Sequence, residues 1–145
     1  MNEFTVISVN ISEAKGTVKV PVAGIELRPG HGVTGDAHAG PWHRQVSLLA
    51  EESIARMKAA GHAVKPGDFA ENITTRGVVL PDLPIGTRLF IGTCKLEVTQ
   101  IGKECHSGCA IFKAVGSCVM PHEGIFARVL TGGWIHAQDR GHYGV

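Results

Sequence analysis

Cysteine is the residue type with the clearest chemical potential in this sequence, because three of the four cysteines lie close together as Cys105, Cys109 and Cys118. A thiol reacts or binds metal as the thiolate, and neighbouring cations favour that form. Lys103 and a protonated His106 flank Cys105 and can lower its pKa from the reference value of about 8.5. We therefore expect Cys105 to be a reactive or ligating thiolate, although a free cysteine is also commonly a small buried hydrophobic residue.

The same segment offers a zinc site as an alternative. Cys105, Cys109, Cys118 and His122 follow the pattern C-x3-C-x8-C-x3-H, which supplies four donors that zinc accepts. Closed zinc sites of this kind usually stabilise domains too small to form a core, whereas this chain is long enough to bury one. A catalytic or cofactor-binding thiolate is the first hypothesis, and a zinc-stabilised interaction module stays open.

A polar segment that contains Asp36, His38, His43 and Arg44 is rich in groups that bind ligands. Arg44 offers two parallel donors to a phosphate or carboxylate, and the histidines can donate to anions or move protons. The alternative is a turn in which Asp36 caps backbone amides and the histidines are merely exposed. The composition favours neither interpretation. His38 and His106 are the candidate groups for proton transfer.

A second polar segment contains Glu71, Asn72, Thr74 and Arg76. Glu71 and Asn72 could recognise the edge of a heterocycle while Arg76 holds its anionic end. By itself the composition is more typical of a capped turn followed by a solvated strand. Arg128 could face the same mouth, although alternating polarity around it also fits an outward surface charge.

These side chains need a scaffold, and the sequence predicts one made of short strands. The 19 glycines and 7 prolines divide the apolar residues into short runs, several with β-branched residues at alternating positions. Segments 28–44 and 61–86 are predicted to be ordered loops, where binding sites usually lie. Strands are predicted over residues 4–10, 18–26, 45–49, 87–91, 94–100, 124–130 and 134–137, and one covering helix over 51–60.

Cys94 differs from the clustered cysteines because it lies inside a predicted strand. Cys94, Leu96 and Val98 share one face of that strand, while the alternate residues share the other. This period of two is expected where one face is buried. We therefore predict that Cys94 belongs to the core.

The bulk properties predict a single domain over residues 1–145, since this length allows one sizeable core but not two. The net charge is +1 and the basic residues are scattered, so we expect no nucleic-acid partner and no anionic membrane partner. No signal sequence and no apolar run of about 18 residues is recognised. We therefore expect a cytoplasmic protein with reduced thiols.

Taken together, the motifs resemble the MOSC family, which is named for the C-terminal domain of molybdenum cofactor sulfurases, and especially its short bacterial single-domain members. Their order and spacing along most of the chain make the likeness specific. It is carried by GDAHAG at 35–40, RQVSLL at 44–49, PGDFAENITT at 66–75, the glycines and apolar residues of 85–92, LEVTQ at 96–100 and the Cys105 segment.

The resemblance implies a mainly β fold, a MOSC-type β-barrel with one or two short covering helices. It implies that Cys105 matches the cysteine proposed to accept sulfur from a pyridoxal-phosphate-dependent cysteine desulfurase, or to contact molybdenum. The implied partners are a cysteine desulfurase, proteins that make or accept the molybdenum cofactor, and a small anionic pterin. Pyridoxal phosphate is expected only on the desulfurase.

Two features depart from the family pattern. Gln138 and Asp139 stand where the family usually has Gly-Asp, which alters the expected edge of the pocket. The additional Cys109 and Cys118 leave room for a metal or for a resolving thiol that a mechanism with one cysteine does not need.

The leading hypothesis is that Cys105 carries sulfur as a persulfide, or supplies a thiolate to the molybdenum of a bound molybdopterin, at the mouth of the barrel. A molybdenum-dependent reductase of N-hydroxylated compounds, as in larger relatives, is the enzymatic alternative. The zinc-stabilised module is the non-enzymatic one. The residues expected to contact the pterin or its phosphate are Asp36, His43, Arg44, Glu71, Asn72, Thr74, Arg76, Lys103 and Arg128.

Overall fold

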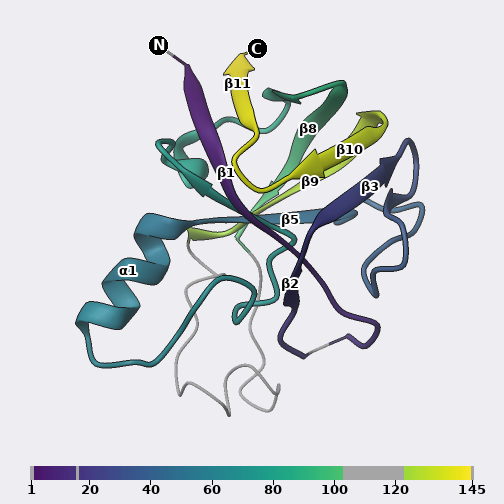
Figure 1. Cartoon of the computed structure of the whole chain (residues 1–145). Coiled ribbons are helices and arrows are strands. Elements are labelled where there is room, and N and C mark those ends of the chain that lie inside the picture. Colours follow the sequence, from purple (N-terminus) through teal and green to yellow (C-terminus); the bar gives the residue numbers. More distant parts are fainter. Residues whose placement is uncertain (1, 16, 103–122, 145) are drawn as a thin grey trace.

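Seven strands close into a barrel in the computed structural model, which describes residues 2–15, 17–102 and 123–144 (Figure 1). The strands follow the order β11-β7-β8-β9-β5-β6-β1, and pairing of β1 with β11 closes the sheet. Within the described residues the fold is mainly β with one α-helix, which confirms the predicted fold class. The bounds are β1 Glu3–Ile11, β5 Val46–Ala50, β6 Ile73–Arg76, β7 Arg88–Ile91, β8 Cys94–Ile101, β9 Ile125–Thr131 and β11 Arg140–Gly144.

Smaller elements surround the barrel. A three-stranded sheet has the order β10-β3-β4, and β2 extends the barrel sheet beside β1. A short 3-10 helix, η1, precedes β7. The bounds of these elements are β2 Val20–Val22, β3 Gly24–Arg28, β4 Gly32–Val33, β10 Gly133–His136 and η1 Leu80–Asp82.

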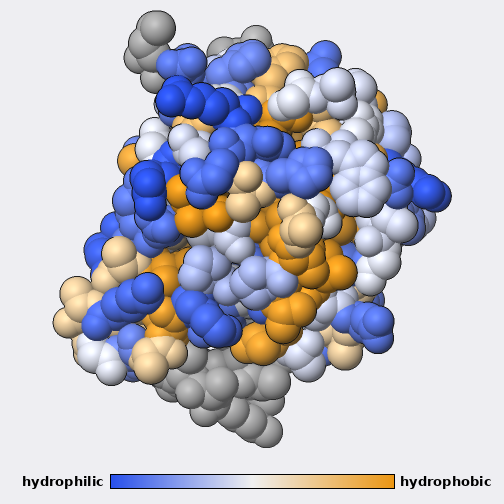
Figure 2. Space-filling view, in the orientation of Figure 1, coloured by the Kyte–Doolittle hydropathy of each residue, from blue (hydrophilic) through white to orange (hydrophobic). Residues whose placement is uncertain are grey.

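The α-helix α1 (Glu51–Ala59) follows β5 directly and covers one side of the barrel (Figure 1). Figure 2 shows hydrophobic surface beside this helix as well as over the barrel. In the described part of the chain, no helix has the length and apolar character that crossing a membrane requires. The helix encloses a second apolar cluster, formed by Leu49, Ile54, Met57, Val64, Phe69, Ala70 and Phe126.

Burial along β8 alternates with a period of two, as predicted. Cys94, Leu96 and Val98 are buried in the main core, and the residues between them are partly exposed. Cys94 is only 1% exposed, and burial together with the charge of Asp139 raises its thiol pKa to about 11. Cys94 is therefore a core residue and a poor nucleophile at neutral pH.

The structure corrects the predicted strand boundaries at several points. The strand expected over 18–26 is two strands, because the chain leaves β1 after β2 and pairs with β10 through β3. The sequence analysis did not predict β4, β6 or β11, and β6 lies inside the expected loop 61–86. Ile73, Thr74 and Thr75 are all buried, Ile73 in the main core and Thr74 in hydrogen bonds with Asn10 and Glu71, so no polar alternation marks this strand.

Candidate functional site

The cysteine-containing segment joins the barrel between β8 and β9. The described residues on its two sides meet there, because the Gly102 N–H donates to the Gly124 carbonyl oxygen over 2.7 Å. The predicted residues Lys103, Cys105, His106, Cys109, Cys118 and His122 lie outside the described residues.

A buried ionic cluster of Lys19, Asp36 and His38 lies between the loop after β1 and the loop before β5. The Lys19 Nζ atom is 2.8 Å from Asp36 Oδ1, 3.0 Å from His38 Nδ1 and 3.1 Å from Ser12 Oγ. These three contacts match the three donors of an ammonium group. The side chains of Lys19 and Asp36 have 0% exposure, so a charged pair is fully enclosed.

Asp36 is held as a carboxylate. Burial by itself raises the pKa of this group, but the hydrogen bond and charge of Lys19 and the backbone amides of His38 and Ser12 outweigh burial. The net result is a pKa below the ordinary value of 3.8. Asp36 is therefore ionised at neutral pH and neutralises Lys19.

His38 is the partly exposed member of the cluster, with 22% of its side chain accessible. Its Nδ1 atom is 3.0 Å from the Lys19 ammonium and 3.8 Å from Asp36 Oδ2. Since an ammonium can only donate, the shorter contact makes Nδ1 an acceptor and leaves the ring proton on Nε2.

Basic side chains gather around Trp42, next to this cluster. The indole N–H of Trp42 donates to the His38 carbonyl oxygen over 2.7 Å, which fixes the ring. The Arg44 guanidinium lies 5.0 Å from the Trp42 ring and 5.7 Å from the Phe126 ring, and Lys15 Nζ lies 5.8 Å from Trp42. Arg44 Nε is buried and has no hydrogen-bond partner among the described residues. An unpartnered buried donor of this kind fits an anionic ligand.

The loop that carries these groups is attached to the strand from which the cysteine segment begins. His43 Nε2 is 2.9 Å from Gln100 Oε1, and Gln100 Nε2 donates to the Gly102 carbonyl oxygen over 2.7 Å. The Thr99 hydroxyl also donates to the His43 carbonyl oxygen. The basic groups and the start of the cysteine segment are therefore joined by direct hydrogen bonds.

His43 and Arg128 line a cavity of about 650 Å³ on the outside of β8 and β9. Its wall includes Trp42 and Ile85. Arg128 Nη2 lies 2.6 Å from Glu97 Oε1, and the Arg128 guanidinium holds the pKa of Glu97 below its usual range. The structure thus brings His43 and Arg128 to the wall of one cavity.

Other predicted site residues are placed elsewhere. Glu71, Asn72 and Thr74 have 0% exposure, and their side chains bond to groups of the protein rather than facing a cavity. Asn72, for example, donates to the Asn10 carbonyl oxygen over 3.2 Å. Arg76 is exposed and paired with Glu51 of α1 over 2.7 Å. The structure does not bring these side chains to the loop that carries Asp36, His38 and Arg44.

Lys19 is the site residue that the sequence analysis missed, together with its partner Ser12. A lysine is almost never fully buried unless it is paired. The signal in the sequence is a single lysine between valines, in Val18-Lys19-Val20, directly before a strand. Its partner Asp36 lies seventeen residues further along, so only the fold shows the pair.

Comparison with known proteins agrees with this fold. A family model described as the MOSC domain matches residues 35–140. The chain is similar in structure to the YuaD protein from Bacillus subtilis, with a TM-score of 0.76, 16% identity, and coverage of 97% of this chain and 95% of that one. Among curated protein sequences, none matches the chain.

Two YiiM crystal structures are also similar. The one from Geobacillus stearothermophilus has a TM-score of 0.74 and 18% identity, and covers 98% of this chain and 75% of that chain. The one from Escherichia coli has a TM-score of 0.69 and 18% identity, and covers 99% of this chain and 70% of that chain. At these identities the likeness is one of fold.

Proposed function

The chain belongs to the MOSC domain family, which is linked to proteins of the molybdenum cofactor, and from this premise we propose that it carries sulfur or binds that cofactor through Cys105. The predicted family resemblance is thus confirmed, while the role of Cys105 is our proposal. We also propose a cytoplasmic location, since a persulfide-forming cysteine works in a reducing compartment.

The observation that best supports this proposal is the attachment of the basic loop to the start of the cysteine segment. Cys105 lies three residues after Gly102 in the sequence, and Gly102 is hydrogen-bonded through Gln100 to His43. Arg44 follows His43 and has an unpartnered buried donor. Positive charge and donors near a thiol favour the thiolate, which is the reactive form.

As a sulfur carrier, Cys105 would react with a persulfide on a cysteine desulfurase. Its thiolate attacks the outer sulfur of the donor persulfide, and a new S–S bond forms at Cys105. The old S–S bond breaks, and the donor cysteine leaves as a thiolate. The reaction is a sulfur transfer without net oxidation, so it needs no further oxidant. Pyridoxal phosphate is needed only by the desulfurase.

The described residues also fit an anionic pterin. Lys15 and Arg44 supply two cations beside the Trp42 ring. Arg44 Nε is buried without a partner among the described residues, so a pterin phosphate could accept a hydrogen bond from it. When bound, the cofactor would supply a molybdenum centre with a soft, sulfur-rich ligand set that can include a thiolate.

A purified cysteine desulfurase with L-cysteine as substrate provides the test. We expect the wild-type chain and the Cys94→Ala variant to gain the mass of one sulfur atom. The Cys105→Ser variant should gain none, because it lacks the accepting thiolate. Cys94→Ala is the matched control because Cys94 is a buried cysteine that the mechanism does not use. Equal sulfur loading of all three proteins contradicts a role for Cys105.

The same proteins, expressed with molybdenum cofactor available, separate the alternatives. If the wild type binds molybdenum and pterin and Cys105→Ser does not, the result supports cofactor binding through Cys105. If the loaded protein reduces an N-hydroxylated base when an electron donor is added, the result indicates the reductase. Stoichiometric zinc indicates the zinc module formed by Cys105, Cys109, Cys118 and His122. Among the described residues there is no group of three or more His, Cys, Asp or Glu side chains that could hold a metal.

A further inference from the structure

Glu71 is an enclosed acid that the proposed chemistry does not use. Its side chain has no exposed surface. Oε2 accepts a hydrogen bond from the Gly67 N–H over 3.0 Å and another from the Thr74 hydroxyl over 2.7 Å. Oε1 is buried and has no partner among the described residues. The backbone amides of Phe69 and Glu71 also favour the charged form of this group, yet burying a carboxyl group is costly, so its presence needs an explanation.

Gly67 connects this carboxyl group to Lys19. The Gly67 carbonyl oxygen accepts a hydrogen bond from the Lys19 N–H over 2.8 Å. The two backbones are so close that a Cβ at position 67 would lie 2.3 Å from the Lys19 carbonyl oxygen. Gly67 also has a φ of +92°, a conformation that glycine adopts most easily. The turn that Glu71 holds is therefore pressed directly against the backbone of Lys19.

Asn10 makes a second connection between Glu71 and the ionic cluster. Its Nδ2 atom donates to the Glu71 carbonyl oxygen over 3.1 Å and to Thr74 Oγ1 over 3.3 Å. Ser12 follows two residues later, and its hydroxyl oxygen accepts a hydrogen bond from Lys19 Nζ over 3.1 Å. Both the backbone of Lys19 and a partner of its ammonium are thus tied to the groups around Glu71.

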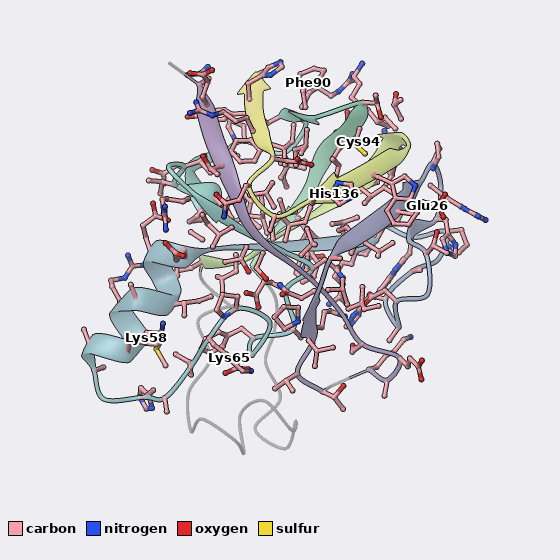
Figure 3. All side chains as sticks on the ribbon, in the orientation of Figure 1. Glu26, Lys58, Lys65, Phe90, Cys94 and His136 are labelled. Atoms are coloured by element: carbon pink, nitrogen blue, oxygen red, sulfur yellow. The ribbon has the colours of Figure 1, made fainter. Side chains whose placement is uncertain are left out.

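The surroundings of Glu71 contain few charges. Ser8 and Asn10 from β1 and Thr74 from β6 are neutral polar groups. In the turn before it, Lys65 and Asp68 pair with each other over 2.7 Å at the surface. Figure 3 shows Lys65 in the loop below the barrel, well away from Cys94 on β8. Among the described residues, Lys19 is the charged residue whose backbone contacts the Gly67 turn, and its ammonium lies 2.8 Å from Asp36 Oδ1.

We infer that Glu71 is a positioning residue: it holds the Gly67 turn against the Lys19 backbone, so that the Lys19 ammonium reaches both Asp36 and His38. Ionisation of Glu71 changes the strength of its hydrogen bond to the Gly67 amide, and with it the position of the turn. A carboxylate accepts a hydrogen bond from the Gly67 amide more strongly than a neutral acid does. The inference goes beyond the proposed function and does not depend on it. The contacts between Glu71, Gly67 and Lys19 stand without it.

The hydrogen bond between Glu71 and the Gly67 amide should change in strength with pH in the neutral range. Burial raises the pKa of Glu71 from 4.5 to about 7, although the Gly67 amide and the Thr74 hydroxyl act in the opposite direction. Because the raised value favours the neutral acid in the folded chain, folding becomes less favourable as pH rises from about 4.5 to about 7. Glu71→Gln removes this dependence.

Nuclear magnetic resonance of the full chain tests the inference between pH 5 and 9. We expect the backbone amide signals of Gly67 and Lys19 and the Nζ signal of Lys19 to shift together, with a midpoint near pH 7. In Glu71→Gln all three transitions should disappear. The matched control Asp68→Asn removes a partly buried carboxyl group of the same turn, which pairs with Lys65, and should leave them unchanged. A Lys19 transition that persists in Glu71→Gln would come from a group other than Glu71 and would overturn the inference.

Thr74→Val is a second variant, which keeps the shape of the side chain and the negative charge of the site. Loss of the Thr74 hydroxyl removes a hydrogen bond to the carboxylate, so the midpoint should move to higher pH. An unchanged midpoint, or a Gly67 shift that Lys19 does not follow, contradicts the inference. These signals do not involve Cys105, so a failed sulfur transfer would leave this result standing.

Discussion

Replacing Lys19 with methionine is expected to lower the free energy of unfolding by about 3–5 kcal/mol at neutral pH. Methionine retains much of the length and apolar surface of the lysine side chain but leaves the enclosed Asp36 carboxylate without its cation. Breaking a buried pair by removing one partner is costly for this reason. Urea denaturation of the wild type and Lys19→Met at pH 7 measures the difference.

The double variant Lys19→Met/Asp36→Asn separates the charge effect from packing. The asparagine oxygen can still accept hydrogen bonds from the Ser12 and His38 amides, so the double variant should be more stable than Lys19→Met alone. The pKa of Asp36 is depressed in the fold, so the stability it contributes is present above about pH 3.8 and is lost as pH falls further. A loss below about 1 kcal/mol in Lys19→Met would show that the pair is not enclosed as described.

Gly67→Ala is expected to lower the free energy of unfolding by about 2–5 kcal/mol, from two separate causes. An alanine at φ +92° is strained, and its Cβ would lie 2.3 Å from the Lys19 carbonyl oxygen, so the backbones must move apart. The same displacement should weaken the Lys19 contacts with Asp36 and His38. Denaturant unfolding measures the loss of stability, and the Lys19 Nζ signal reports the weakened contacts with Asp36 and His38.

Gly35→Ala and Gly144→Ala are matched controls for these two causes. Gly35 has a φ of +82° with no atom within 4 Å of an added Cβ, so it measures the conformational cost alone, about 1 kcal/mol. Gly144 also has free space and does not have a positive φ, so alanine there should be nearly neutral. If Gly67→Ala costs no more than Gly35→Ala, the turn is not pressed against Lys19.

Secondary structure is predicted correctly where a local sequence pattern indicates which side chains are buried. The alternation of Cys94, Leu96 and Val98 predicts both β8 and the side of it that enters the core, and the structure confirms both. By contrast, β6 consists of Ile-Thr-Thr-Arg, a polar run whose first three residues are buried. No local period indicates that burial, so its composition predicted a capped turn and a solvated strand within the expected loop 61–86.

The same limit applies to the candidate site. The types and spacing of Asp36, His38 and Arg44 predict a cluster of ligand-binding groups, and the structure places all three around the loop that contains Trp42. Glu71 has an equally polar sequence context, yet it faces the interior. A sequence shows that a polar group must find a partner, but the fold decides whether that partner is a ligand or the protein.

The rate at which Cys105 is alkylated, followed as a function of pH, tests the central claim most directly. Cys109 and Cys118 are replaced with serine, whereas Cys94 is kept because burial raises its thiol pKa to about 11. We predict a half-maximal rate below pH 8.5, the value for an ordinary cysteine, and a higher midpoint after Arg44→Gln. The control Arg76→Gln, which removes a guanidinium paired with Glu51, should leave the midpoint unchanged. A midpoint at or above about pH 8.5 that Arg44→Gln does not change would contradict the account.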